Sequence, residues 1–457
     1  MKINRQLLEK YNVPVPRYTS YPPANYFHSS FDEREAVEAL QKSNTWTPSN
    51  LSFYLHVPFC SQLCYYCGCF THITRNSEVM EQYTNYLLKE MELYKNILAP
   101  GRRISQIHWG GGTPNYLPLE HIERIMQFFH RHYTFIPDAE VAMECHPAHL
   151  TPEYLRGLRD LGFNRISIGI QDFSEDVLRK SNRALPLMPV DEIVAKAREL
   201  GFSINMDFIY GLPGQTVESF GRTMQRAVSL DPDRLAVFSY AHVPWVKPHQ
   251  KLLEKYVLPG AGEKISMFEK AYEILTGAGY VSIGLDHFAK PGDELAVALR
   301  QRRLCRNFQG YCTRRTTGQV YAFGVSGISQ LSKAYLQNTK NLNAYYRALD
   351  EGRFPFEKAY FLSHDEQIIG GLINELMCNR YIDLENWAAD HGLDLAQLKA
   401  LTSVDEDRLR TFEAEGLIRY NGKTLEVTQQ GMFFLRNIAA AFDPLLGRSD
   451  KKFSKSL

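Results

Sequence analysis

Residues 51–69 have the sequence Leu-Ser-Phe-Tyr-Leu-His-Val-Pro-Phe-Cys-Ser-Gln-Leu-Cys-Tyr-Tyr-Cys-Gly-Cys, an apolar run followed by closely spaced thiols. The run at 51–57 predicts a buried strand. Cys60, Cys64 and Cys67 follow it at CxxxCxxC spacing. Closed iron–sulfur clusters use four thiolates and structural zinc sites use four ligands. A set of three thiols therefore favours a [4Fe-4S] cluster with one iron open to a small molecule.

Two other uses of these cysteines fit the sequence less well. A zinc site would take Cys69 as its fourth ligand, but zinc ribbons use two separated CxxC pairs and the chain has no second pair. Disulfide frameworks are typical of short secreted chains, whereas this sequence has eight cysteines in 457 residues and no apolar signal segment at its start. We therefore expect reduced thiols and a cytoplasmic protein.

The composition narrows the class of protein. Apolar residues make up 44% of the chain, aromatic residues make up 12%, and the formal net charge is +1. Such a chain can bury a large core and has no overall charge bias toward nucleic acids or membranes. No apolar run approaches the ~20 residues needed to span a bilayer. We expect one large domain with smaller additions, acting without a nucleic-acid or membrane partner.

Apolar and β-branched runs alternate with helix-like segments, which is typical of βα units and a parallel sheet. The expected strands are 51–57, 106–110, 140–144, 165–171, 203–209 and 234–240. Six such units fit either an incomplete (β/α)6 barrel or a Rossmann-type open sheet. Cys60, Gly110, Glu144, Gln171 and Asp207 all fall at or just past expected strand ends. This favours the barrel, because parallel barrels collect their active sites at the carboxyl ends of the strands.

The C-terminal region has a different pattern. From about Ser363 several helices precede two alternating strands within 417–428, joined by Asn421-Gly422, which favours a type I′ hairpin turn. This order outlines a winged helix. The segment around Arg408 is balanced in charge, which favours a structural lid over a nucleic-acid reader. We divide the chain into an N-terminal extension (1–48), a barrel with its own extension (49–350) and a mostly helical, winged-helix-like lid (351–457).

Several motifs together resemble one enzyme family. The CxxxCxxC run is similar to the cluster motif of radical S-adenosylmethionine enzymes, and its extension to Cys69 resembles the oxygen-independent coproporphyrinogen III oxidases. Further family-like stretches are 16–22 (Pro-Arg-Tyr-Thr-Ser-Tyr-Pro), 108–114 (His-Trp-Gly-Gly-Gly-Thr-Pro), 209–213 (Ile-Tyr-Gly-Leu-Pro), 286–289 (Asp-His-Phe-Ala) and 306–311 (Arg-Asn-Phe-Gln-Gly-Tyr). The resemblance covers nearly the whole chain and implies the radical enzymes' α/β barrel.

The resemblance also implies two molecules of S-adenosylmethionine. The residues that it places around the first molecule, chelated to the cluster, are Tyr54, Tyr66, Gly111, Glu144 and Ile328. Those that it places around the second are Gly112, Thr113, Gln171, Arg183, Asp207 and Ala241. Because three thiolates and the cofactor complete the cluster, we expect Cys69 to act in catalysis and not as a ligand.

The implied reaction is the oxidative decarboxylation of two propionates of coproporphyrinogen III, which gives protoporphyrinogen IX in haem biosynthesis. A 5′-deoxyadenosyl radical would start it. The implied partners are this tetrapyrrole and an electron donor such as flavodoxin or ferredoxin, with the chain acting as a monomer. Propionates suit guanidinium groups. Six arginines fall within 300–315, which contains no acidic residue: Arg300, Arg302, Arg303, Arg306, Arg314 and Arg315. This charge bias has two equally weighted interpretations, contact with the substrate or a basic face exposed to solvent. For substrate contact we assign Arg306, Phe308 and Gln309.

The chain departs from the family pattern at three places. Cys145-His146-Pro147-Ala148 stands where the family commonly has Val-Asp-Pro-Arg, Cys305 stands in place of a histidine, and the segment after Tyr311 is one residue longer. Two rival functions remain, a haem-binding paralogue without oxidase activity and a radical enzyme acting on another tetrapyrrole. Cys69 and the motif at 16–22 favour the oxidase, since the paralogues usually carry Phe at the position of Cys69 and lack the N-terminal motif.

Overall fold

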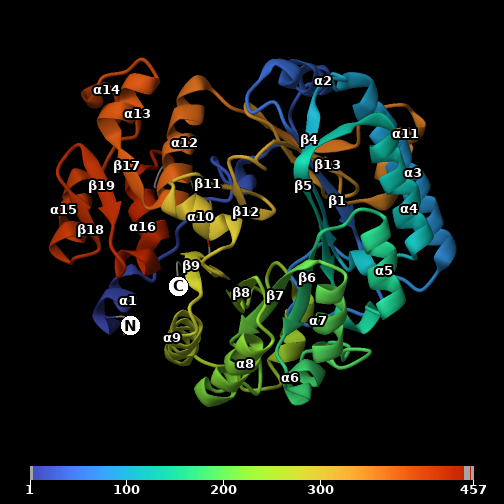
Figure 1. Ribbon diagram of the computed structural model, residues 1–457. Helices are drawn as coiled ribbons and strands as arrows, with labels where there is room; N and C mark the ends of the chain where they lie inside the picture. Colours follow the sequence, from blue (N-terminus) through green and yellow to red (C-terminus); the bar gives the residue numbers. More distant parts are fainter. Residues whose placement is uncertain (1–3, 447–452, 454–457) are drawn as a thin grey trace.

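The centre of the molecule is a curved, mixed sheet of twelve strands, seen in the computed structural model of Figure 1. The structure describes residues 4–446 and 453. Six parallel strands follow one another across the sheet in chain order: β1 (Leu51–Val57), β4 (Arg103–Gly111), β5 (Thr134–Cys145), β6 (Arg165–Gln171), β7 (Ser203–Tyr210) and β8 (Arg234–Ser239). The six strands expected from the sequence are confirmed.

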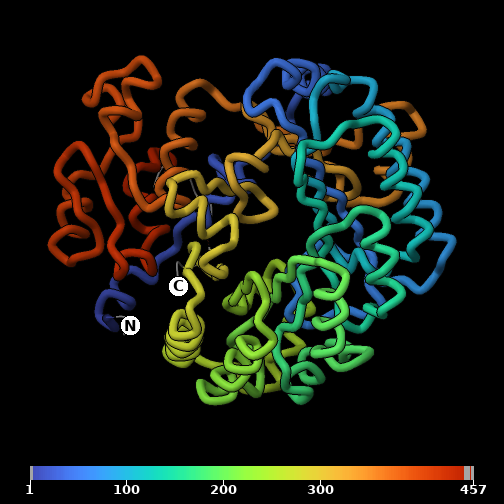
Figure 2. The backbone as a smooth tube through the Cα atoms, viewed as in Figure 1, coloured from blue at the N-terminus to red at the C-terminus, as the bar shows by residue number. Residues whose placement is uncertain are grey.

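The strand order distinguishes the two folds that the sequence left open. A Rossmann sheet reverses its strand order at a switch point, whereas β4 to β8 extend from β1 in one direction only. Helices line the outer side of the curve (Figures 1 and 2): α3 (Ser77–Ile97), α4 (Leu119–His132), α5 (Pro152–Asp160), α6 (Glu175–Lys180), α7 (Val190–Glu199) and α8 (Val217–Ser229). The incomplete barrel is confirmed.

Alternation along the strands separates the core from the barrel interior. In β6, Ile166, Ile168 and Ile170 are buried, and the intervening side chains are only partly buried. The same alternation in β7 leaves Asn205 and Asp207 partly buried between fully buried apolar neighbours. The apolar set packs toward the helices, so the polar set faces the inside of the barrel.

Further strands extend the sheet beyond the barrel on both sides. β13 (Gln319–Phe323) pairs parallel with β1, and β14 (Ile328–Gln330), β15 (Ala334–Asn338) and β16 (Phe356–Phe361) follow it antiparallel. At the other edge, β10 (His287–Ala289) and β9 (Val281–Gly284) follow β8. The hairpin of β11 (Leu304–Asn307) and β12 (Gly310–Thr313) lies with α10 (Glu294–Arg300) between this sheet and the C-terminal region (Figure 1).

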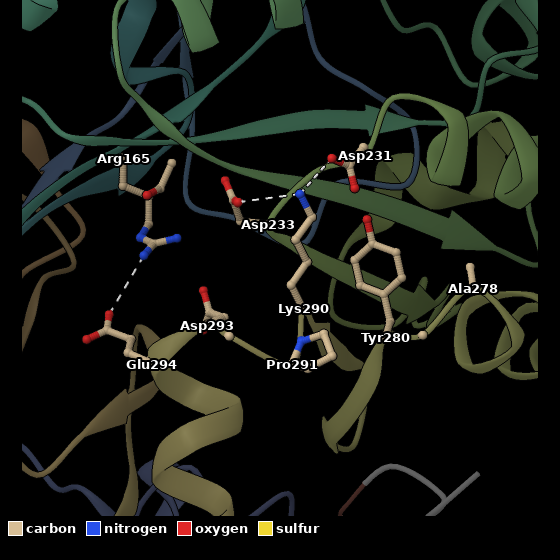
Figure 3. Close-up of a pocket in the computed structure, with 12 residues that line it drawn as sticks. Arg165, Asp231, Asp233, Ala278, Tyr280, Lys290, Pro291, Asp293 and Glu294 are labelled. Atoms are coloured by element: carbon tan, nitrogen blue, oxygen red, sulfur yellow. Dashed lines mark hydrogen bonds and ion pairs between the residues drawn. The ribbon is translucent and has the colours of Figure 1, made fainter.

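A charged network closes the amino-terminal end of the barrel. Arg165 and Arg234, the first residues of β6 and β8, both face Glu140; the Nε atom of Arg165 lies 2.7 Å from its Oε2. Burial raises the pKa of Glu140, but the two guanidiniums and other donors outweigh this and hold it at about 2. Asp293 and Glu294 complete the network (Figure 3) beside a cavity of about 670 Å³. This end of the barrel is therefore a structural plug.

The C-terminal region has its own apolar core. It contains α12 (His364–Asn379), β17 (Tyr381–Asp383), α13 (Leu384–Asp390), α14 (Leu395–Leu401), α15 (Glu406–Ala414), β18 (Ile418–Tyr420), β19 (Thr424–Val427) and α16 (Leu435–Ala439). Apolar side chains of the N-terminal helix α1 (Arg5–Tyr11) and of Val15, Tyr18 and Tyr21 belong to the same core. The remaining elements are α2 (Glu33–Lys42), β2 (Phe59–Cys60), β3 (His72–Ile73), α9 (Ala261–Gly277) and α11 (Leu342–Asp350).

Two sequence expectations change in this region. The hairpin exists, but a type I′ turn needs positive φ at two central residues, and only Gly422 has it; Asn421 instead accepts hydrogen bonds from Lys423 and Thr424 through Oδ1. β16 pairs with β15 in the central sheet, so we propose the domain boundary after residue 361 in place of 350. The winged-helix resemblance stays a prediction. Among the described residues no helix has the length and apolar character needed to cross a membrane.

Candidate active site

The three predicted cluster ligands lie together on the loop that follows β1. Cys60, Cys64 and Cys67 are partly buried, and Cys69 is exposed. The thiol of Cys67 shares a hydrogen bond with that of Cys69, which together with nearby positive charge lowers the pKa of Cys67 to about 6 despite burial. The loop thus places the three predicted ligands at the carboxyl end of the barrel strands, with the lowered pKa confined to Cys67.

Polar groups from neighbouring strands approach these sulfurs. The Oγ1 atom of Thr113 lies 3.3 Å from the Sγ atom of Cys60, and Arg183 donates from Nη1 to the Sγ atom of Cys64 across 3.7 Å. Burial raises the pKa of the Cys60 thiol to about 11, and the contact with Thr113 offsets only part of this effect. In the described part of the chain no three His, Cys, Asp or Glu side chains are arranged to hold a single ion. A cluster spreads its ligands over several irons, so it does not require that convergence.

Gly110, Gly111 and Gly112, which we call the glycine ledge, lie at the end of β4 beside the cysteine loop. A Cβ atom on Gly112 would lie 2.7 Å from the carbonyl oxygen of Pro58, and one on Gly111 would meet the ring of His56 at 2.8 Å. Gly111 also has φ of +116°, which side chains rarely adopt. The ledge therefore requires glycine, because Gly111 and Gly112 pack directly against His56 and the backbone of the cysteine loop.

Two histidines that the sequence analysis did not single out orient residues of the predicted first cofactor site. His56 Nε2 lies 3.1 Å from the carbonyl of Phe70 and must donate to it, so Nδ1 accepts from the hydroxyl of Tyr54 at 3.1 Å. Burial lowers the pKa of His56 to about 4, which keeps it neutral. His108 contacts Glu144, with 3.0 Å between Nε2 and Oε1. Their alternating positions on β1 and β4 were the signal that could have found them.

The predicted second cofactor site is a set of polar side chains on β6 and β7. Asp207 accepts from the Ser167 hydroxyl at 2.7 Å and from Asn205 at 2.8 Å, and burial raises its pKa to about 6. Gln171 has a strained φ of +69°, and its Oε1 atom is buried without a hydrogen-bond partner. A buried, unsatisfied acceptor is costly in an empty site. The residues present therefore fit a polar ligand that donates hydrogen bonds.

The structure brings the remaining predicted cofactor residues to the same end of the barrel. Tyr66 lies within the cysteine loop, and its hydroxyl is 3.0 Å from Nη1 of Arg183. Ala241 follows the end of β8 and is exposed. Ile328 begins β14, which runs antiparallel to β13 and so starts near the carboxyl end of that strand. The assignment of each to one cofactor molecule stays a prediction.

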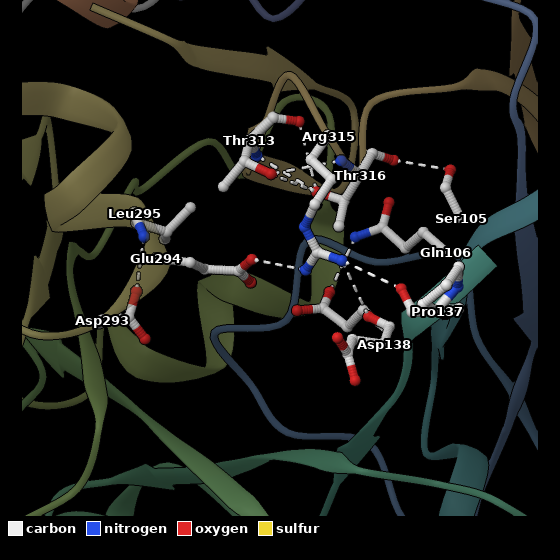
Figure 4. A network of polar contacts seen from close by, with 12 residues as sticks. Ser105, Gln106, Pro137, Asp138, Asp293, Glu294, Leu295, Thr313, Arg315 and Thr316 are labelled. Carbon is white, nitrogen blue, oxygen red and sulfur yellow. Dashed lines mark hydrogen bonds and ion pairs between the residues drawn. The ribbon is translucent and has the colours of Figure 1, made fainter. Parts of the chain in front are cut away.

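The arginine-rich segment serves largely structural roles. Arg315 pairs with Glu294 at 3.4 Å and donates to the carbonyl of Pro137 (Figure 4), and Arg314 pairs with Glu375 at 2.8 Å. Arg306 differs from these. It donates to the carbonyl of Arg17 at 3.0 Å, and its Nε atom is buried without a partner.

The other two predicted substrate residues lie at the tip of the same hairpin. The ring of Phe308 packs edge-on against Tyr335. Gln309 has a buried Oε1 atom without a partner. Unsatisfied polar atoms at Arg306 and Gln309 are consistent with a ligand at this hairpin, and the substrate contacts stay a prediction.

The departures at residues 145 and 146 are accommodated locally. Cys145 is buried in the barrel core, and His146 accepts from the Ala148 amide through Nδ1 at 3.1 Å. His146 thus caps the short helical turn that follows, a task that an aspartate could also perform. Burial and nearby Arg183 lower its pKa well below the usual value, so it is neutral. Neither change disturbs Glu144.

These features define an enzyme of the radical S-adenosylmethionine superfamily: residues 54–227 match the model described as "Radical SAM superfamily". Enzymes of this superfamily use a [4Fe-4S] cluster and S-adenosylmethionine, which the thiols, glycine ledge and unsatisfied acceptor fit. Residues 362–434 match the model "HemN C-terminal domain". The chain belongs to the family of oxygen-independent coproporphyrinogen III oxidases.

Similarity to individual proteins extends over the full chain. The chain is 40% identical to the oxygen-independent coproporphyrinogen III oxidase of Synechocystis, and the match covers 100% of this chain and 98% of the relative. It is 40% identical to the Escherichia coli enzyme of the same name, covering 96% and 95%. The solved structure of coproporphyrinogen III oxidase from Escherichia coli superposes with a TM-score of 0.90 at 37% identity, covering 97% of this chain and 99% of that one.

Proposed function

We propose that this protein converts coproporphyrinogen III to protoporphyrinogen IX without oxygen, by oxidative decarboxylation of two propionate side chains. The observation that carries the proposal is the assembly, at one end of one barrel, of the cysteine loop, the glycine ledge and the polar set on β6 and β7. Full-length similarity to enzymes named for this substrate supports it.

The chemistry divides between the bound groups and the chain. The cluster and S-adenosylmethionine, when bound, supply a carbon-centred radical that removes a hydrogen from a propionate. The chain must orient the two partners and exclude water from them. His56 holds the hydroxyl of Tyr54 in place. The glycine ledge packs against the cysteine loop, and by family resemblance it binds the methionine part of the cofactor. Cys69 is exposed beside the cluster ligands, where a catalytic thiol could reach substrate.

Two decarboxylations per substrate suit two cofactor molecules. Asp207, held by Ser167 and Asn205, can bind a ribose hydroxyl pair, and Gln171 can accept a hydrogen bond from the second molecule. Arg183 also contacts Cys64 and Tyr66, so it lies where both cofactors would be reached.

A cavity of about 600 Å³ next to Ala241 suits part of a tetrapyrrole. Tyr240, Phe268 and Tyr272 supply apolar walls, and Arg17 and Lys264 supply positive charge. Cavities of this size are typical of small-molecule sites. Arg17 belongs to the family-like motif at 16–22 and is held by Asp286 at 2.6 Å, so we assign the cavity to propionate-bearing rings.

The C-terminal region, with α1 packed into its core, acts as a lid over the open side of the barrel. We further propose a monomer that works in the cytoplasm, where thiols stay reduced, and that takes electrons from a flavodoxin or ferredoxin. No nucleic acid or membrane takes part.

Anaerobic product analysis tests the main proposal. The purified chain, reconstituted with iron and sulfide, is supplied with S-adenosylmethionine, dithionite and coproporphyrinogen III. Protoporphyrinogen IX is the expected product, lighter than the substrate by one carbon dioxide and two hydrogen atoms for each of the two propionates. Cofactor cleavage without loss of carbon dioxide from this substrate would contradict it and support a radical enzyme acting on another tetrapyrrole, and stable haem binding without turnover would support the haem-binding paralogue.

A further inference from the structure

Exposed large apolar side chains gather around the cysteine loop. In the part of the chain that the structure describes, seven such side chains are exposed, and all except Val13 lie on three segments, 60–76, 181–189 and 241–258. These six are Ile73, Leu187, Trp245, Val246, Leu252 and Val257. Val257 is 91% exposed and Trp245 is 76% exposed, so neither contributes to the core. We call the exposed surface of these three segments the cluster face.

The segment 241–258 lies directly against the loop that carries the cluster ligands. Lys247 donates from Nζ to the carbonyl of Cys69 at 2.8 Å, and the Nε2 atom of His249 lies 2.9 Å from the carbonyl of Cys67. The same segment is therefore bonded to the cluster loop on one side and carries Trp245 and Val257 toward solvent on the other.

The other two segments contact the same loop. Ile73 on β3 pairs in register with Cys60 on β2. Asn182 donates from Nδ2 to the carbonyl of Leu63 at 2.8 Å, within the segment that carries exposed Leu187. The segment 60–76 contains the cluster loop and the segment 181–189 contacts it, so the cluster face is the protein surface next to the predicted cluster ligands.

This face is also strongly basic. Outside buried Arg183, the three segments carry Arg75, Lys247, Lys251 and Lys255 but a single acidic residue, Glu254, so the net charge of the face is 4 − 1 = +3, whereas the whole chain carries +1. Glu254 contacts His242 across 3.1 Å. An apolar patch with a basic rim suits an acidic partner, because opposite charge steers association and apolar contact holds the complex.

We propose that the cluster face is the docking site of the electron donor, a small acidic protein that carries one electron at a time. This deepens and rests on the proposed function, because reductive cleavage of S-adenosylmethionine consumes one electron. The donor loses that electron and the cluster gains it, with no bond formed between the proteins. A second copy of this chain would not dock there symmetrically, because two faces of charge +3 would repel each other.

The test compares a protein donor with a chemical one, using the anaerobic holoenzyme. The donor is purified flavodoxin, kept reduced by its NADPH-dependent reductase; the chemical reductant is dithionite. The variant Lys251→Glu/Lys255→Glu reverses two exposed charges of the face. The control Arg34→Glu/Lys42→Glu makes the same charge change on α2, where the side chains of Arg34 and Lys42 are 90% and 64% exposed.

We expect the Lys251→Glu/Lys255→Glu variant to raise the KM for flavodoxin about tenfold at low salt, with a smaller effect at high salt. Its dithionite-driven turnover should match that of the wild type, and the control should behave as the wild type with both reductants. Val257→Asp should weaken flavodoxin use without affecting dithionite turnover.

Three results would overturn the docking site. The first is an unchanged KM for flavodoxin, and the second is an equal loss of turnover with both reductants, which would indicate a role in substrate access. The third is a wild-type dimer that the charge reversal separates into monomers. Spectroscopic reduction of the cluster by flavodoxin, measured without substrate, reports docking separately. The docking site could therefore be confirmed even if no protoporphyrinogen IX formed, which would contradict the proposed function alone.

Discussion

The guanidinium of Arg183 donates from Nη1 to the Sγ atom of Cys64 across 3.7 Å, and this contact joins the predicted second cofactor site to the cluster loop. Arg183 is 8% exposed and also donates to the carbonyl of Gly169 at the end of β6. Its guanidinium therefore reaches both the cysteine loop and the end of β6, the strand that carries Gln171. Substitutions on this side of the barrel will separate the two roles only if Asp207 is changed independently of Arg183.

Asp207→Ala should leave the cluster intact and suppress decarboxylation, because the carboxylate predicted to bind a ribose is lost and Ser167 and Asn205 lose their acceptor. Leaving buried polar groups unpaired typically costs ~1–3 kcal/mol. Anaerobic absorption spectra report the cluster, and product analysis at limiting S-adenosylmethionine reports turnover. Asp207→Asn is the matched control for the hydrogen bonds. Arg183→Ala should lower both signals, because it also contacts Cys64. Wild-type product yield from Asp207→Ala would contradict a second cofactor at this site.

Cys69→Ser should retain the brown chromophore and iron content of the wild type while losing oxidase activity. The reason is that three thiolates plus the cofactor complete the cluster, and Cys69 is exposed beside them. Iron and sulfide analysis after reconstitution makes the measurement. Cys64→Ser provides the comparison and should lose the cluster. If the two variants lost iron equally, Cys69 would have to be reassigned as a ligand.

Glu90 should make the stability of the fold fall as pH rises. It is fully buried and accepts from the Gly324 amide, Asn338 and the Tyr345 hydroxyl at 2.7 Å each, yet burial still raises its pKa to about 7 from 4.5. Between these two pKa values the folded state binds more protons than the unfolded state. The contribution of Glu90 to the free energy of unfolding is therefore full below about pH 4.5 and declines until about pH 7.

The variant Glu90→Gln does not titrate and isolates this effect. The unfolding free energy of the wild type minus that of the variant should fall by up to about 3 kcal/mol from pH 5 to pH 8. Denaturant titrations of the holoenzyme at several pH values provide the measurement. A difference that stayed constant or grew with pH would show that Glu90 is ionised throughout.

Arg306 and Arg315 should separate substrate binding from structure within the arginine-rich segment. Arg315→Ala removes the contacts to Glu294 and Pro137 and should lower thermal stability, with a loss of ~1–2 kcal/mol for a partly exposed network. Arg306→Ala should instead raise the KM for coproporphyrinogen III with little change in melting temperature. The reverse assignment of these two effects would contradict a substrate role for the hairpin tip.

The sequence by itself determined the six barrel strands and predicted the cluster ligands. Both signals are local: alternating or continuous apolar runs define strands, and CxxxCxxC places three thiols on one short loop. The (β/α)6 barrel followed because polar residues end successive strands. Family resemblance added the cofactor residues, since no local rule marks Ala241 or Ile328.

Only the tertiary structure decided what depends on contacts between distant segments. It showed that Arg314 and Arg315 pair with acids outside their own segment, which a local charge count cannot see. It joined α1 to the C-terminal core and β16 to the central sheet, and it left Gly422 as the one central turn residue with positive φ. It also brought the segments 181–189 and 241–258 against the loop that carries the predicted cluster ligands. Chain order fixes local conformation, but burial, charge pairing and exposed surfaces are set by which segments meet in space.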